Sequence, residues 1–183
     1  MIRRVVLGVA LWSGAALADA DRPILLPTRD VDVTYRSVQP DGRVLDQGFR
    51  WRAADRIARV RLPSGGVEML MDYRTRHVSV MHLSEHTSVE VDDAVPPPPG
   101  GADEASYRRR GTARVAGVEC TMWDTRDEAG RATQVCITAD GVLLRAGQDG
   151  QVLIEAVSVS YAAQDAASFH VPAGWTRTVG EAK

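Results

Sequence analysis

The sequence predicts a mostly β protein, a single antiparallel meander of about ten strands with little helix. Three observations support this fold class. Apolar and polar residues alternate with a period of two through most segments after residue 30, and turn-forming residues recur about every ten residues. No helical period of comparable strength appears in these segments. The length of 183 residues suits one domain with a substantial core.

The first half of the chain shows the alternation most clearly. Val31, Val33 and Tyr35 share one face of the first predicted strand, and polar residues occupy its other face. A Pro-Asp-Gly turn follows, in which proline presets φ and glycine accepts the positive φ of a tight hairpin. We expect the next strands at residues 44–52, 56–62, 67–73, 77–83 and 87–91.

Residues 92–101 interrupt the pattern with four consecutive prolines, which cannot join a strand ladder. The pieces on either side are each too small to hold a core, so we expect a loop within one domain spanning residues 21–175. This loop covers residues 92–110 and includes a possible short helix at 102–110. Further strands are expected at 111–119, in the segment between the two cysteines, at 142–146 and at 152–161. Residues 176–183 are expected to form a flexible polar tail.

The only two cysteines, Cys120 and Cys136, lie in a segment whose pattern is strand, polar turn, strand. If the two arms form a hairpin centred on residues 127–130, the cysteines fall nearly opposite each other. Facing strand residues lie within the Cα separation that a disulfide tolerates. We therefore predict a Cys120–Cys136 disulfide, worth about 3 kcal/mol on the chain-entropy estimate.

The first twenty residues predict a secretory signal peptide. Arg3 and Arg4 form a basic start, residues 5–17 are largely apolar, and small residues fit cleavage after Ala18 or Ala20. The apolar stretch of about 13 residues is short of the roughly 20 that span a bilayer. We expect a soluble periplasmic protein without a transmembrane segment in the mature chain, an environment in which a disulfide persists.

Several functional classes find little support in the residues. The formal net charge is −2 with both signs interspersed, which does not favour nucleic-acid binding. His77, His82 and His86 lie close together with Glu85, a set that could suggest zinc. The segment is predicted as a strand running into a turn, where the imidazoles need not meet. We expect solvated histidines and predict no metal and no cofactor.

The sequence also offers no clear catalytic motif. Ser64 stands in a Ser-Gly-Gly turn that lacks the Gly-x-Ser-x-Gly elbow and precedes no predicted helix. No glycine-rich loop opens a helix, so no phosphate cradle is predicted. We expect a protein that is not an enzyme. An uncharacterised hydrolase stays as a third alternative, because catalytic triads assemble from residues far apart in sequence.

The remaining signal is a surplus of apolar side chains on both faces of the predicted strands. A sheet with one face exposed to solvent needs apolar side chains on its other face only. One interpretation is an apolar concavity that binds a hydrophobic ligand, and methionine suits such variable partners. The other is a barrel interior filled by its own side chains. The candidate lining residues are Trp51, Met69, Met71, Val80, Met81, Leu83 and Trp123.

Four segments, in this order along the chain, carry a resemblance to a known family. They are residues 59–91, AGVECTMW at 116–123, CITADGVLLR at 136–145, and the most specific piece, FHVPAGW at 169–175. Together they resemble exported bacterial domains of unknown function that are related in fold to the periplasmic lipoprotein carrier LolA. The resemblance covers most of residues 28–175. It implies a curved sheet forming an incomplete barrel, with helices at the open side and apolar side chains lining a lipid-binding concavity.

These inferences give three functional hypotheses. The first is a periplasmic, non-enzymatic protein that binds a hydrophobic ligand such as a lipid, an acyl chain or a lipoprotein. The second is an envelope scaffold module that binds another protein and has a self-filled β core. The third is the hydrolase mentioned above.

Overall fold

The structure, a computed structural model, describes residues 22–39, 41–95, 107–127 and 129–180, so the predicted signal peptide lies outside the described residues. The first six strands are β1 (Val31–Val38), β2 (Val44–Arg52), β3 (Ile57–Arg61), β4 (Val67–Asp72), β5 (His77–His82) and β6 (Thr87–Val91). The later elements are β7 (Arg108–Val115), β8 (Val118–Arg126), β9 (Ala132–Ile137), β10 (Leu143–Gln148), β11 (Gln151–Ser160), the 3₁₀ helix η1 (Ala166–Phe169) and β12 (Thr176–Val179).

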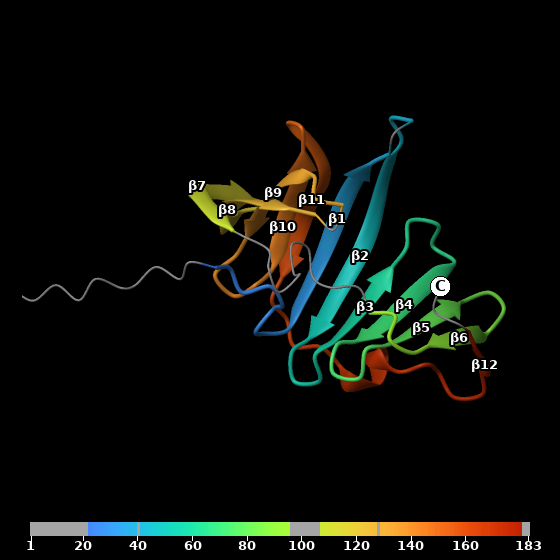
Figure 1. The fold of residues 1–183 in the computed structure, drawn as a ribbon. Coiled ribbons are helices and arrows are strands. Elements are labelled where there is room, and N and C mark those ends of the chain that lie inside the picture. The colour runs from blue at the N-terminus through green and yellow to red at the C-terminus, as the bar shows by residue number, and fades with distance from the viewer. Residues whose placement is uncertain (1–21, 40, 96–106, 128, 181–183) are drawn as a thin grey trace, which may run out of the picture.

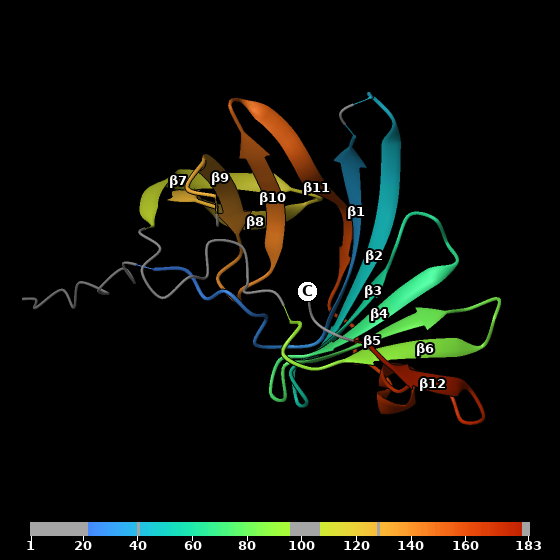
Figure 2. The same ribbon diagram turned by 45° about the vertical axis from the view of Figure 1, so that its right-hand side comes forward.

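All twelve of these strands belong to one open sheet, in the order β12-β6-β5-β4-β3-β2-β1-β11-β10-β9-β8-β7. The prediction of a mostly β fold with one curved sheet is therefore confirmed, with two strands more than the expected ten or so. The sheet curls around a concave side, while η1 lies on the opposite, convex side (Figures 1 and 2). In the described chain η1 is the only helical element. Most segments alternate apolar and polar residues with a period of two, which favours strands over helices.

Two joins connect strands that are not neighbours in sequence. β1 pairs with β11 in antiparallel fashion, and β6 pairs with β12 in parallel, with Thr176 opposite Thr87. The second join differs from the expectation of a flexible tail, since residues 176–179 form a paired strand. The tail is polar, so its sequence carried no apolar alternation to mark a strand. Its pairing comes from the backbone of β6.

The segment between residues 92 and 119 also differs in part from the expectation. Residues 111–119 were predicted as one strand, but a turn at Ala116 and Gly117, both with positive φ, divides them between β7 and β8. The possible helix at 102–110 falls mostly outside the described residues, and its last three residues begin β7. On the near side of this loop, Val95 is buried in the main core.

The predicted disulfide between Cys120 and Cys136 is confirmed. It joins β8 to β9, and the two Cα atoms are 5.5 Å apart. The cysteines are not direct cross-strand partners, because Cys136 faces Met122 in the strand register. Cys120 lies two residues before Met122 in β8 and on the same face, so the bridge runs diagonally. It fixes the register of this hairpin and buries both sulfur atoms in the main core.

Candidate functional site

The concave face of the sheet is built from apolar residues that face one another across β2 to β6. One row, which we call the covered row, contains Trp51, Ala58, Met71 and Val78, all nearly excluded from solvent. Leu26, from the segment before β1, and Val95, from the segment after β6, pack in the same core cluster. The covered row is therefore part of a core that the chain fills with its own side chains.

The neighbouring row on this face is less well covered, and we call it the open row. Its members are direct cross-strand partners in sequence from β2 to β6: Phe49, Val60, Met69, Val80 and Val89. Val60 is buried, whereas the other four side chains keep partial exposure to solvent. A contiguous apolar strip that crosses five strands and stays partly exposed is the chief candidate for binding on this face.

The structure places the seven predicted lining residues in three different environments. Trp51, Met69, Met71 and Val80 lie together on the concave face, two in each row. Met81 and Leu83 belong to a separate cluster on the convex face. Trp123 packs with Val135 and Ile137 in a third cluster of the β8–β9 hairpin. Of these seven residues, only Met69 and Val80 both lie on the concave face and remain partly exposed to solvent.

The convex cluster explains part of the apolar surplus. The segment from residue 162 to residue 175, here called the C-terminal strap, connects β11 to β12 across the convex face of the sheet (Figure 1). Its Val171 and Trp175 pack on Leu70, Met81, Leu83 and Ile57. Met81 is only 1% exposed as a result. Apolar residues on this face are therefore needed to seat the chain's own strap.

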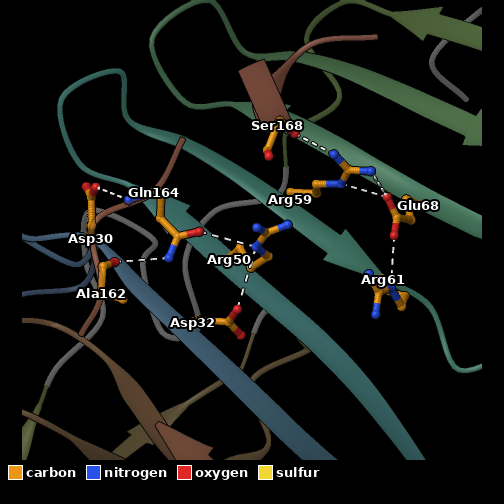
Figure 3. A network of polar contacts seen from close by, with 9 residues as sticks. All are labelled: Asp30, Asp32, Arg50, Arg59, Arg61, Glu68, Ala162, Gln164 and Ser168. Carbon is orange, nitrogen blue, oxygen red and sulfur yellow. Dashed lines mark hydrogen bonds and ion pairs between the residues drawn. The ribbon is translucent and has the colours of Figure 1, made fainter. Parts of the chain in front are cut away.

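Polar contacts hold the strap in place along the same path (Figure 3). The carboxylate of Asp30 accepts hydrogen bonds from the backbone N–H groups of Ala53 and Gln164, both at 2.8 Å. Arg50 Nε donates to Gln164 Oε1 at 3.2 Å, and Arg59 Nη1 donates to the carbonyl oxygen of Ser168 at 2.5 Å. These bonds satisfy polar groups that the strap would otherwise cover without partners.

Glu68 is the acidic centre of this polar network. Its side chain is 3% exposed and accepts from Arg59 Nε at 2.6 Å and Arg61 Nε at 2.9 Å. Burial alone would raise the pKa of Glu68, but the hydrogen bonds from Arg61 and Arg59 outweigh it and lower the pKa. Glu68 therefore stays ionised and holds two guanidinium groups in fixed positions on the convex face.

Sequence reasoning missed this network. The sequence shows these residues as Arg59-x-Arg61 in β3 and Glu68 in β4. The alternating pattern alone predicts that they lie on a solvent-exposed face of the sheet. The strand register is what brings Arg61 opposite Glu68, and Arg50 opposite Arg59. The signal that could have identified this network is a set of arginines on the same face of adjacent strands with a single acidic residue beside them.

His77 lies between two carboxylates on the convex face. Its Nδ1 is 2.8 Å from Asp92 Oδ1 and its Nε2 is 2.7 Å from Glu90 Oε2, and these hydrogen bonds raise the pKa of His77. The nearby Ser79 hydroxyl donates to Glu90 at 2.5 Å rather than to the imidazole. The arrangement is a cross-strand ion pair when the imidazole is protonated, and it lacks the serine–histidine hydrogen bond of a nucleophilic pair.

The three neighbouring histidines do not form a common site. His77 and His82 stand at opposite ends of β5, and His86 lies in the following turn, 5.5 Å from the ring of Trp175. Within the described ranges, no group of three or more histidine, cysteine or acidic side chains is placed to hold a metal ion. No helix in that part of the chain combines the length and apolar character needed to cross a bilayer.

Comparison with known proteins gives information on the fold. No family model and no curated protein matches the sequence. Among solved structures, an uncharacterized conserved protein from Thermus thermophilus is similar, with a TM-score of 0.60 and 15% identity over 84% of this chain and 91% of that chain. At this level of identity, the match establishes a shared fold.

A looser likeness extends to MucB in the structure of the Pseudomonas aeruginosa MucA/MucB complex. The TM-score is 0.45 with 14% identity, and the match covers 77% of this chain and 55% of that chain. This likeness is too loose to assign a shared function.

Proposed function

We propose that this chain is a periplasmic, non-enzymatic binding protein that holds an extended hydrophobic ligand, such as an acyl chain, on the open row of the concave face. The observation that carries the proposal is the contrast between the two adjacent rows. The four side chains of the covered row are nearly excluded from solvent, whereas four of the five side chains of the open row remain partly exposed. The resemblance to the lipoprotein-carrier fold and the signal-peptide pattern support the same proposal.

The dimensions of the open row suit an extended apolar chain. Five adjacent strands spaced about 4.8 Å apart give a strip of about 19 Å, which is comparable with a long acyl chain. Each methylene group buried on such a strip contributes about 0.8 kcal/mol. The row contains no charged residue, so an apolar ligand would cover it without stripping water from an ion.

Uptake of a fluorescent fatty acid by the purified mature protein tests the proposal. Met69→Glu puts a charge in the middle of the open row and should abolish uptake. Val44→Glu is the matched control, because Val44 is 56% exposed and lies on the opposite face of the sheet. It should leave uptake unchanged. Native mass spectrometry should also find ligand on the wild-type protein after gentle purification. A protein that is always ligand-free and takes up no fatty acid would contradict the proposal.

A second candidate function, binding of an envelope protein, is favoured by a different observation. Val38 and Val44 face each other at the end of the β1–β2 hairpin, and both are at least half exposed. Leu153 is also exposed. It lies on the adjacent strand β11, next to Ile154, which pairs with Ser37. If this surface binds a protein, Val44→Glu should remove the crosslinked partner while fatty-acid uptake persists. A partner retained by Val44→Glu and lost by Met69→Glu would contradict that assignment.

A further inference from the structure

A small polar cleft on the convex face lies outside the apolar site. It has a volume of about 280 Å³ and is lined by Asp32, Thr34, Arg50, Arg59, Arg61 and Glu68, with Gly48 among them. Gly48 is the cross-strand partner of Arg61 and has no side chain to occupy the space beside it. The volume falls below the range of about 300–1,000 Å³ of drug-sized ligand sites, so the cleft suits a small group.

The charges around this cleft do not cancel. Three arginines from β2 and β3 face two carboxylates, those of Asp32 and Glu68. Arg50 and Arg59 are direct cross-strand partners, a placement that is unfavourable for like charges unless an anion compensates. Glu68 neutralises part of the charge of Arg59 and Arg61. Arg50 hydrogen-bonds to the neutral side chain of Gln164, and it forms a longer ion pair of 3.6 Å with Asp32.

The hydrogen-bond donors at the cleft are only partly used. All three guanidinium nitrogens of Arg59 contact Glu68 or the carbonyl oxygen of Ser168. Arg50 and Arg61 each hydrogen-bond through Nε, and within the described chain their terminal nitrogens donate no hydrogen bond. Arg61 is also 63% exposed, so its outer nitrogens are accessible to a ligand. Two guanidinium groups, held at Nε and unused at their ends, are suited to bind an oxyanion.

We propose that this cleft binds the phosphate group of a small molecule or of a lipid headgroup, held between the terminal nitrogens of Arg50 and Arg61. Each guanidinium donates to the oxyanion while its Nε bond to Gln164 or Glu68 fixes its position. Glu68 is a positioning residue, because its carboxylate orients the guanidinium of Arg61 and does not itself bind the phosphate group. The site lies on the face opposite to the open row and is independent of the hydrophobic ligand.

A purely structural role does not account for all three arginines. Arg59 and Arg50 reach the C-terminal strap through Ser168 and Gln164, and these bonds anchor it. Arg61 bonds to Glu68 on β4 and makes no hydrogen bond to the strap within the described residues. Strap anchoring therefore requires two of these side chains, and the third brings the cleft to three positive charges against two carboxylates.

Titration with inorganic phosphate at low ionic strength tests the site directly. The NMR resonances of the arginine Nε–H groups of the full mature protein are followed at constant chloride. Those of Arg50 and Arg61 should shift and saturate, while that of Arg36 should not. Arg61→Gln should weaken phosphate binding by about tenfold or more, since it removes charge-assisted donors. Arg36→Gln is the matched control, because Arg36 is an exposed, ion-paired arginine outside the cleft. It should change the affinity less than about twofold.

Two further arms identify the source of the phosphate. Glycerol phosphate presents it in solution, whereas phosphatidylcholine vesicles with and without phosphatidylglycerol present it on a surface. Saturable shifts with any of these phosphates that Arg61→Gln weakens support the site. Shifts that rise linearly and equally in Arg36, Arg50 and Arg61 would overturn it, because they indicate general charge screening. An unchanged affinity in Arg61→Gln would overturn it as well. Fatty-acid uptake reports on the other face, so the two proposals can fail separately.

Discussion

The two faces of the β1–β6 part of the sheet are made by alternate residues of the same strands, yet they are covered in different ways. On the concave face, the covered row is nearly excluded from solvent, while the open row keeps partial exposure. On the convex face, a charged network centred on Glu68 lies beside an apolar cluster that the C-terminal strap seals. An apolar residue in these strands can therefore face the core, the partly exposed open row or the strap.

This difference teaches that an apolar surplus in a β sequence has more than one cause. Met69 and Met81 illustrate it, since Glu68 and not Met69 is the direct partner of Met81 in adjacent strands. The two methionines point to opposite faces, one in the open row and one under Val171. These environments should respond differently to the same kind of change.

The largest effect is expected in the covered row. Trp51 is fully buried and its ring meets that of Tyr73 at 5.4 Å, so Trp51→Ala leaves a large cavity. We expect a loss of about 3–5 kcal/mol in the free energy of unfolding, measured by urea denaturation. A loss below about 1 kcal/mol would mean that this row is not a packed core.

A matched pair of methionine truncations separates the two faces. Met81→Ala should cost about 3 kcal/mol, because the side chain is buried under the strap. Met69→Ala should cost about 1 kcal/mol, because its side chain is already partly exposed. Urea unfolding of both variants checks this order. Equal losses would indicate that the open row is covered as completely as the strap cluster.

Removal of the acidic centre of the convex face should have an intermediate effect. Glu68→Gln leaves Arg59 and Arg61 without their carboxylate and should cost about 2 kcal/mol near neutral pH. The pKa of Glu68 is lowered in the folded state, so its contribution is present above the usual value of 4.5 and is lost as the pH falls through the folded pKa. The difference from wild type should therefore shrink in acid. A difference that is constant with pH would contradict the ion pairs.

The smallest effect is expected at His77. Hydrogen bonds to Asp92 and Glu90 raise its pKa above 6.5, so its stabilisation is present below that value and is lost as the pH rises through the folded pKa. His77→Gln should lose less than about 1 kcal/mol at pH 6, because the ion pairs are partly exposed. Thermal unfolding at pH 6 and pH 9 measures it, and the two proteins should be closer at pH 9. A larger gap at pH 9 would reverse the assigned sign.

Much of the fold could be predicted because strand alternation is a local property. Val31, Val33 and Tyr35 show it within five residues, and the cysteine spacing led to the correct disulfide. The β7–β8 turn was missed, since Ala116 and Gly117 carry only a weak turn signal between two apolar segments. Strand β12 was missed because its pairing with β6 depends on backbone geometry rather than on its polar side chains.

The candidate site was harder to predict, because it depends on register and on the path of a distant segment. The face occupied by Met81 and Leu83 follows from alternation, but nothing local shows that Val171 and Trp175 cover it. The open row exists only because Phe49, Val60 and Met69 align across three strands. The arginines of the convex cleft also become a group only through this alignment.

The parallel join between β6 and β12 has a consequence for folding kinetics. Strands β1 to β6 form consecutive hairpins whose contacts are local, so they can assemble early at a low cost in loop entropy. The β1–β11 and β6–β12 joins link segments far apart in the chain and must wait for nearly all of it. The backbone of β6 therefore gains its second neighbour only after β12 has been synthesised. Until that moment the folding chain exposes the unpaired outer edge of β6, which can pair with another chain.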